Sequence, residues 1–250
     1  METSFIFRRA LQALLPATLL LASCGKDDAP APPAAVDQGR VVFVHAAAAA
    51  NTPITVFAND QQAGQLNYGQ NTSYVTVNAG SAAVRVNNGA AVAATQTVAI
   101  AKDQNYSVFA YSSSNSIGSV ALFSTSDDLT IPAAGTAKVR LVYLGVGTAA
   151  PVRLSIPSAT PTGAPTDLTG DVAFGAASAF VAVNAGPLGL SVTSAAAPRA
   201  QVVAVGDGAG AGTGVKTFES GKIYTVVVRG IAGTAVPAAQ QVQAAIIQHN

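Results

Sequence analysis

Two stretches, YGQNTSYVTVNAG at residues 68–80 and FGAASAFVAVNAG at residues 174–186, follow one pattern and lie 106 residues apart. Both begin with an aromatic residue and a glycine, carry a second aromatic residue six positions later, and end in Val-Asn-Ala-Gly. They align without a gap, so a chance match is improbable. A pattern that recurs at long spacing indicates a duplicated structural unit.

Blocks on either side of these stretches recur in the same order. Upstream, RVVFVH at residues 40–45 matches KVRLVY at residues 138–143, 98 residues later. Downstream, KDQNYSVFA at residues 102–110 matches ESGKIYTVVV at residues 219–228, about 118 residues later. The growing separation indicates loop insertions in the second copy. The order of the three blocks predicts two homologous domains.

We expect a first domain at residues 39–125, a connector at residues 126–136 and a second domain at residues 137–250. Each domain consists of short β-favouring runs about ten residues apart, with turn residues between them and no amphipathic helix of useful length. This spacing predicts an all-β fold with two tandem immunoglobulin-like or Greek-key β-sandwich domains. The expected strands lie near residues 41–46, 54–58, 65–68, 73–78, 82–87, 95–100, 105–111 and 120–124, and near residues 138–145, 152–157, 171–174, 179–184, 188–194, 201–205, 223–230 and 242–248.

The Asn-Ala-Gly ending recurs at residues 78–80 and 184–186. Its position between two expected strands predicts a tight turn. Gly80 and Gly186 can adopt positive φ there without a steric penalty.

The repeated blocks resemble the bacterial extracytoplasmic family called "domain of unknown function 4397", here in tandem over nearly all of residues 39–250. The blocks that carry the resemblance are Val42-Phe43-Val44-His45-Ala46, Tyr68-Gly69, Val77-Asn78-Ala79-Gly80 and Gly221-Lys222-Ile223-Tyr224-Thr225-Val226-Val227. The chain departs from the family pattern where AAAANTP at residues 47–53 replaces a polar Ser-Pro-Asp-Ala-Pro segment. The resemblance implies a β-sandwich fold and an envelope or surface setting, and it implies no activity.

The N-terminus has the three parts of a secretory signal. Arg8 and Arg9 supply positive charge, and a 12-residue apolar stretch follows at residues 10–21, shorter than the roughly 20 residues that a membrane-spanning helix needs. Leu21-Ala22-Ser23 then precedes Cys24, the chain's single cysteine, and this order resembles the bacterial lipobox. We therefore expect a lipoprotein signal peptide at residues 1–23 and a lipid on Cys24. The alternative is an ordinary signal peptide with a chance cysteine.

Residues 24–38 are expected to form the lipidated Cys24 and a flexible, Pro-rich linker. Lys26-Asp27-Asp28 resembles the surface-export signal of some Bacteroidota lipoproteins, or it is simply a solvated start to the linker. The predicted location is the outer membrane, lipid-anchored at the cell surface, with the periplasmic face as the alternative.

The composition argues against a nucleic-acid partner and excludes an intramolecular disulfide. The chain has 13 Lys plus Arg and 12 Asp plus Glu, and this balance gives no positive surface for nucleic acid, so nucleic acid is not expected as a partner. One cysteine allows no intramolecular disulfide.

Few residues of the sequence are candidates for catalysis or metal binding. His45 lies on one strand face with Val41 and Phe43, and Tyr143 occupies the equivalent position in the second copy. An imidazole and a phenol at the same position predict a space-filling side chain that bonds to a neighbouring loop. No metal site is expected, because no cysteine or nearby histidine supplies further ligands. A Ser-His-Asp arrangement formed by distant residues stays open as a minor alternative.

Two other motifs are interpreted as structural. GDGAGAGTG at residues 206–214 fits a loose dinucleotide-binding pattern, but a strand-like run follows it where a helix would be required. We therefore expect a mobile loop and no cofactor. The acidic pairs Asp27-Asp28 and Asp127-Asp128 fall in the linker and the connector, and solvated positions are expected for both.

The sequence thus predicts a non-enzymatic, lipid-anchored envelope protein that displays two β-sandwich modules for binding, adhesion or scaffolding, with an envelope protein or a glycan as partner. The first alternative is a glycan-binding surface subunit of an uptake system. The second is an envelope hydrolase with a site formed by distant residues.

Overall fold

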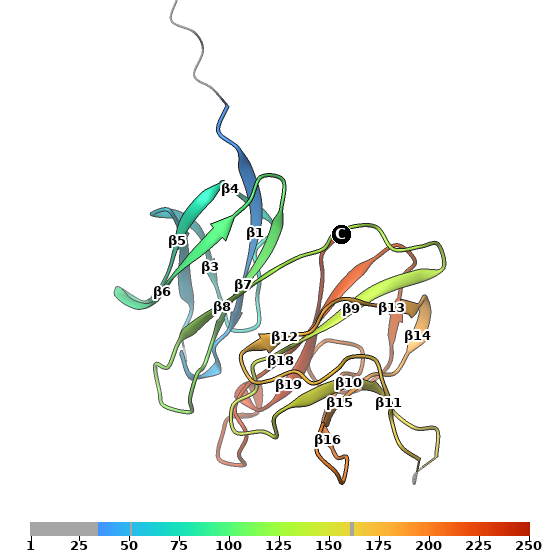
Figure 1. Ribbon diagram of the computed structural model, residues 1–250. Helices are drawn as coiled ribbons and strands as arrows, with labels where there is room; N and C mark the ends of the chain where they lie inside the picture. Colours follow the sequence, from blue (N-terminus) through green and yellow to red (C-terminus); the bar gives the residue numbers. More distant parts are fainter. Residues whose placement is uncertain (1–34, 51, 161–162) are drawn as a thin grey trace, which may run out of the picture. The chain divides into compact units, whose positions relative to one another are not determined.

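A computed structural model describes residues 35–50, 52–160 and 163–250, and residues Val36–Asn250 form one compact unit (Figure 1). The predicted signal peptide, its recognition residues Leu21, Ala22 and Ser23, the lipidation site Cys24 and the export motif Lys26-Asp27-Asp28 lie outside the described residues. Within those ranges, no helix has the length and apolar character required to cross a membrane.

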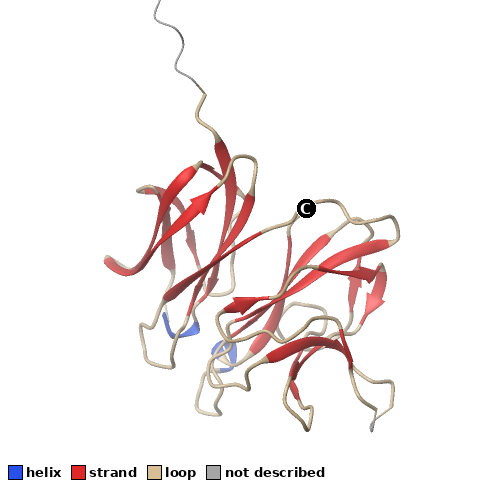
Figure 2. Ribbon diagram, in the orientation of Figure 1, coloured by secondary structure: helices blue, strands red, loops and turns tan. Residues whose placement is uncertain are grey.

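The described chain is all-β, as the sequence predicts. Figure 2 shows strands throughout, with the 3₁₀ turns η1 (Ala48–Ala50) and η2 (Ala238–Gln240) as its helical segments. We call the described residues up to Asp127, directly after β8, the first half, and those from Thr136, where β9 begins, the second half. Each half contains two sheets that enclose a hydrophobic core.

The first half pairs its strands as β4-β1-β7-β8 and β3-β2-β5-β6. Strand β1 lies between an antiparallel neighbour, β4, and a parallel one, β7, so the connections cross between the sheets. The bounds are β1 (Gln38–Ala46), β2 (Ile54–Ala58), β3 (Gln61–Leu66), β4 (Val75–Asn78), β5 (Gly80–Asn88), β6 (Ala91–Ile100), β7 (Asn105–Tyr111) and β8 (Ala121–Ser126).

The second half repeats this scheme with more interruptions. Its sheets are β12-β9-β18-β19, with β13 also on β9, and β11-β10-β15-β16, while β14 and β17 form a separate pair. The bounds are β9 (Thr136–Tyr143), β10 (Val152–Ile156), β11 (Thr166–Asp167), β12 (Ala176–Ala177), β13 (Val181–Asn184), β14 (Gly186–Leu188), β15 (Ser191–Ser194), β16 (Gln201–Ala204), β17 (Lys216–Phe218), β18 (Ile223–Arg229) and β19 (Gln243–Gln248).

The strand predictions are correct for most of the chain and fail in four ways. Strand β3 begins at Gln61 and ends at Leu66, ahead of the run expected at 65–68. The run at 171–174 forms only an isolated bridge, Val152 to Val172, and not a strand. The run at 188–194 is split, because β14 pairs with β17 whereas β15 pairs with β10 and β16. The strands β11, β12 and β17 are only two or three residues long, and their sequences contain no hydrophobic run that predicts a strand.

The Asn-Ala-Gly motif joins two sheets. Strand β4 ends at Asn78 and pairs with β1, whereas β5 begins at Gly80 and pairs with β2 and β6. Gly80 has φ +113° and Gly186 has φ +125°, as the turn prediction requires. The motif therefore carries the chain from one layer of the sandwich to the other.

Central strands are buried on both faces. On β1, Val41 and Phe43 belong to the first-half core, whereas Val44 and Ala46 belong to a separate cluster that also contains second-half residues. On β9, Val139 and Leu141 likewise face the second-half core. Burial on both faces explains why these strands appear as continuous apolar runs instead of alternating patterns.

Candidate functional site: a buried polar network between the halves

The two halves meet through a small apolar cluster. Its buried members are Val44, Ala46 and Phe109 from the first half and Val142, Leu144 and Val227 from the second. In the repeat alignment these are equivalent positions, 98 residues apart for the β1/β9 pairs and 118 apart for the β7/β18 pair. Each half therefore uses the same face of the same sheet, as in an isologous interface.

Asp127 lies beside this cluster, and its predicted solvated position is wrong. Its side chain is fully buried, and its carboxylate accepts hydrogen bonds from Tyr74 Oη at 2.5 Å and from Ser107 Oγ at 2.8 and 3.0 Å. The reason is local: β8 extends to Ser126, and the Asp127 N–H donates to Asn105 O at 2.7 Å. The two residues of the acidic pair therefore lie in different surroundings: Asp127 is buried, whereas Asp128 is exposed and pairs with Lys138 at 2.6 Å.

Arg140 brings the opposite charge from the second half. Its Nη2 lies 2.5 Å from Asp127 Oδ1, Nε donates to Thr225 Oγ1 at 2.9 Å, and Nη1 donates to the Ser126 carbonyl oxygen at 2.9 Å. The guanidinium carbon also lies 4.5 Å from the centre of the Phe180 ring. This is a buried, well-bonded ion pair that joins the two halves.

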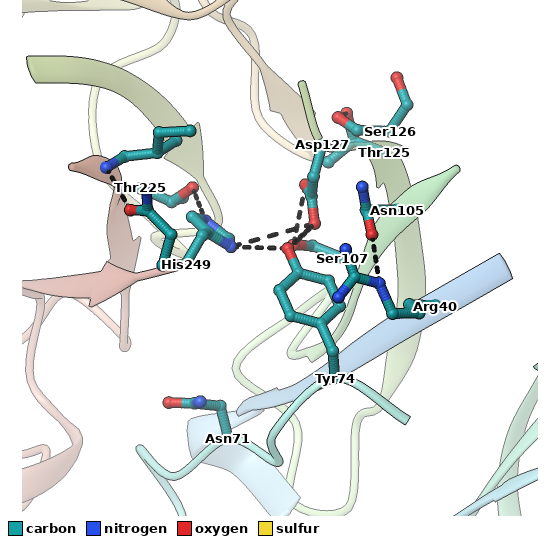
Figure 3. A network of polar contacts seen from close by, with 12 residues as sticks. Arg40, Asn71, Tyr74, Asn105, Ser107, Thr125, Ser126, Asp127, Thr225 and His249 are labelled. Carbon is teal, nitrogen blue, oxygen red and sulfur yellow. Dashed lines mark hydrogen bonds and ion pairs between the residues drawn. The ribbon is translucent and has the colours of Figure 1, made fainter. Parts of the chain in front are cut away.

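His249 completes the network (Figure 3). Its Nδ1 lies 2.8 Å from Tyr74 Oη and its Nε2 lies 2.7 Å from Thr225 Oγ1. Tyr74 donates its proton to Asp127, so its oxygen must accept from Nδ1–H. Thr225 accepts from Arg140, so its own proton goes to Nε2. The donors and acceptors therefore all match when the imidazole is neutral and carries its proton on Nδ1.

The electrostatics favour this protonation state. Burial lowers the pKa of His249 to about 4; nearby Asp127 opposes this shift and Arg140 reinforces it. Burial, followed by the charge of Asp127 and the hydrogen bond to it, raises the pKa of the Tyr74 hydroxyl. Both groups are therefore neutral near pH 7, and Asp127 with Arg140 forms the charged pair.

The order Thr225, His249, Tyr74, Asp127 has the connectivity of a proton relay. Thr225 and Ser107 are both completely buried, and each hydroxyl is occupied by Arg140 or Asp127. The hydrogen bonds among these four groups link the two halves, and Tyr74 and His249 also line a surface hollow of about 300 Å³. Within the described ranges, no three His, Cys, Asp or Glu side chains are placed to hold a metal ion.

His45 and Tyr143 behave as predicted. Both side chains are fully buried, and each bonds to the loop that follows its strand: His45 Nε2 lies 3.3 Å from Thr52 O, and Tyr143 Oη contacts Thr148 and Ala149 O. Burial lowers the pKa of His45 to about 4, so this imidazole is also neutral near pH 7.

The aromatic-Gly motifs lie at the same interface. Arg229, at the end of β18, places its guanidinium 5.0 Å from the Tyr68 ring centre, and a Cβ on Gly69 would lie 2.8 Å from Arg229 Nη2. Tyr111, the equivalent of Arg229 in the first half, contacts the Phe174 ring at 5.7 Å beside Gly175. Each motif thus receives a side chain from the other half.

The glycine-rich segment at 206–214 is a loop without a following helix, since β17 comes next. Its backbone is bonded to β19: Ala209 bridges to Ala245, and the Ile246 N–H donates to Gly208 O at 2.9 Å. These bonds hold the segment against the sheet, contrary to the prediction of a mobile loop.

Sequence reasoning missed His249 and Asp127. No sequence motif singles out His249, and Asp127 falls in the expected connector, where a solvated position is predicted. Yet the pairings Tyr106 to Ser126 and Tyr224 to Gln248 place Asp127 and His249 at equivalent positions. Extending the repeat alignment past β8 and β19 would have aligned the two residues.

Residues 39–150 match the family model described as "Domain of unknown function (DUF4397)". No curated protein matches the chain. Among solved structures, a "putative cell adhesion protein" from Bacteroides eggerthii DSM 20697 is similar over 88% of this chain and 97% of that chain, with 11% sequence identity and a TM-score of 0.24. A TM-score this low does not establish a shared fold.

Proposed function

We propose that this protein is a lipid-anchored cell-envelope protein that displays two β-sandwich modules as a single unit for binding, adhesion or scaffolding. The observation that carries the display role is the buried Arg140–Asp127 pair between the halves, surrounded by hydrogen-bonded side chains. Separating the halves would expose an apolar cluster and break this pair, which opposes independent movement.

The anchor is inferred from the sequence. A diacylglycerol on Cys24, with an acyl chain on the new amino group, would supply the two or more chains that stable membrane attachment needs. The Pro-rich residues between Cys24 and β1 would then separate the sandwiches from the lipid surface, at roughly 3.1 Å per residue in extended polyproline geometry.

The anchor is tested by labelling cells with a radioactive fatty acid and separating membrane from soluble fractions. We expect wild type and a matched Ser23→Ala variant, which keeps a small residue before the cysteine, to be labelled and membrane-bound. Cys24→Ala should lose the label and become soluble. If Cys24→Ala stays in the membrane fraction with its signal peptide removed, the anchor proposal fails.

The surface location is a separate proposal that rests on Lys26-Asp27-Asp28. Protease shaving of intact cells should release peptides of the wild-type protein, and replacing these three residues by alanine should abolish release while lipid labelling persists. Release that is equal in both strains would overturn the role of this motif.

A further inference from the structure

Strand β13 has a free edge. It pairs with β9 alone, in the register Val181 to Val139 through Asn184 to Thr136. The Ala185 N–H donates to Gly135 O at 2.9 Å, and hydrogen-bonded pairs alternate along an antiparallel ladder. Val181 and Val183 therefore point their backbone groups at β9, whereas those of Ala182 and Asn184 point away from it.

The hydrogen bonds of β9 agree with this orientation of the β13 backbone groups. Lys138, opposite Ala182, donates its N–H to Lys222 O at 3.0 Å, on the β18 side of β9. Ala182 and Asn184 therefore present unpaired N–H and C=O groups along the outer edge, at the spacing that an added strand requires.

An apolar hollow of about 460 Å³ borders this edge. Ile156, Leu168 and Leu188 line it together with Val183, and no lining residue is charged. On the facing sheet the edge strand is β11, which has only two residues. The sandwich is thus incompletely covered where β13 ends its own sheet.

The first half is built the same way. The Ala79 N–H donates to Asp37 O at 2.7 Å, so by the same alternation Thr76 and Asn78 of β4 face outward. The hollow beside β4 is smaller, about 250 Å³, and its wall includes the amide side chains of Asn59, Gln61 and Gln62. The repeated Val-x-Val-Asn-Ala-Gly block therefore creates a free edge beside a hollow in each half, and the second-half hollow has the more apolar wall.

We propose that the outer edge of β13 binds an extended, uncharged segment of a partner protein, which adds as a further strand and places alternate apolar side chains in the hollow. The unpaired backbone groups select a polypeptide backbone, and the strand period of two selects apolar residues at alternate positions. The absence of charge in the lining selects against charged side chains, which would be buried there without a partner. A sugar fits less well, because Asn184 supplies the only polar side chain of the wall.

This inference names the partner class for the proposed display function and rests on it. The test is independent of the anchor, because it uses the full mature chain from residue 24 with Cys24→Ser, in solution. The probe is a capped synthetic peptide of alternating threonine and valine, seven residues long. We expect saturable shifts of the Ala182 and Asn184 amide resonances and at least tenfold slower hydrogen exchange at these amides.

Two variants locate the site. Ala182→Pro removes an outward N–H while leaving the ladder to β9 intact, and proline is tolerated at such edge positions. Leu188→Glu puts a charge at the hollow without altering the backbone of β13. Each should weaken peptide binding at least tenfold, whereas the matched Thr76→Pro on β4 should leave the β13 signals unchanged.

Three results would overturn the proposal. These are no shift at Ala182 and Asn184 at millimolar peptide, undiminished binding to a folded Leu188→Glu variant, or perturbation of the same amides by maltotetraose but not by the peptide. The Leu188→Glu measurement decides the matter even if Ala182→Pro fails to fold.

Discussion

Asp127 and His249 occupy equivalent places in the two halves and carry different chemistry. Asp127 is the ionised member of a buried pair with Arg140, whereas His249 is a neutral link between Tyr74 and Thr225. Arg140 itself aligns with Val42, so the first half has no matching cation. Two identical halves would place like charges opposite each other. The residue differences between the two halves, His249 for Asp127 and Arg140 for Val42, therefore make the contacting face of one half complementary to that of the other.

Replacing Asp127 tests this buried pair. Asp127→Ala leaves Arg140 buried without its counter-charge, and we expect a loss of about 3–5 kcal/mol in the free energy of unfolding. The matched control is Asp128→Ala, which removes an exposed pair and should cost less than about 1 kcal/mol. Urea denaturation of both variants measures the difference. Equal effects would show that Asp127 is not held as described.

His249 makes stability depend on pH. Its folded pKa, about 4, lies below the ordinary value of 6.5, so the unfolded state binds more protons between these two values. The stabilising contribution is fully present above about pH 6.5 and is lost as the pH falls towards 4, by about 3 kcal/mol in all. Denaturation from pH 4 to 7 should show a shallower slope for His249→Gln than for wild type.

His45 supplies the comparison for that experiment. Its pKa is also lowered to about 4, but its partner is a loop carbonyl in the first half and not the network. His45→Gln should therefore flatten the same pH window, and the double variant should remove both contributions. A wild-type slope retained in His249→Gln would contradict the buried neutral imidazole.

The strands are the part of the architecture that the sequence predicts best. Repeated hydrophobic blocks locate β1, β7, β9 and β18 because each must supply buried side chains to a core. The two-residue β11 and β12 were not foreseen, since their pairing depends on the neighbouring strand and not on their own composition. The network was missed for the same reason: charge state and burial depend on residues brought together from six separate segments, which spacing along one chain does not reveal.

Gly80 and Gly186, the glycines of the Asn-Ala-Gly motif, allow a test of backbone conformation alone. A Cβ at Gly80 or Gly186 would meet no atom within 4 Å, but both residues have positive φ. We expect Gly80→Ala and Gly186→Ala each to cost about 1–2 kcal/mol, because side chains disfavour this region. Gly189→Ala is the matched control, with equally open space and no positive φ, and should be nearly neutral. Thermal denaturation compares the three variants.

The two halves form one compact unit because they share a third cluster between their own cores. The Arg229–Tyr68 and Tyr111–Phe174 contacts extend the same interface at its margins. The described residues therefore form four hydrophobic clusters, and the cluster of Ala48, Ala49 and Ile231 joins the halves as well, so loss of the shared cluster around Val44 and Val142 affects both sandwiches.

We therefore expect the unit to unfold in a single transition. Leu144→Ala, in the shared cluster, should lower its stability by about 2–5 kcal/mol and reduce hydrogen-exchange protection in both halves. Ile117→Ala, at a side chain that is 91% exposed, should change little. Two separate transitions, or lost protection confined to the second half, would show that the sandwiches are independent.

The parallel pairing of β1 with β7 has a consequence for the order of assembly. Strand β1 must wait for its parallel partner, which lies some 65 residues further along the chain, and the shared network must wait for His249. Contacts between residues this far apart along the chain slow folding, because the intervening loop must be closed before the contact forms. The final arrangement of the two halves is therefore reached only once the segment that carries His249 is available.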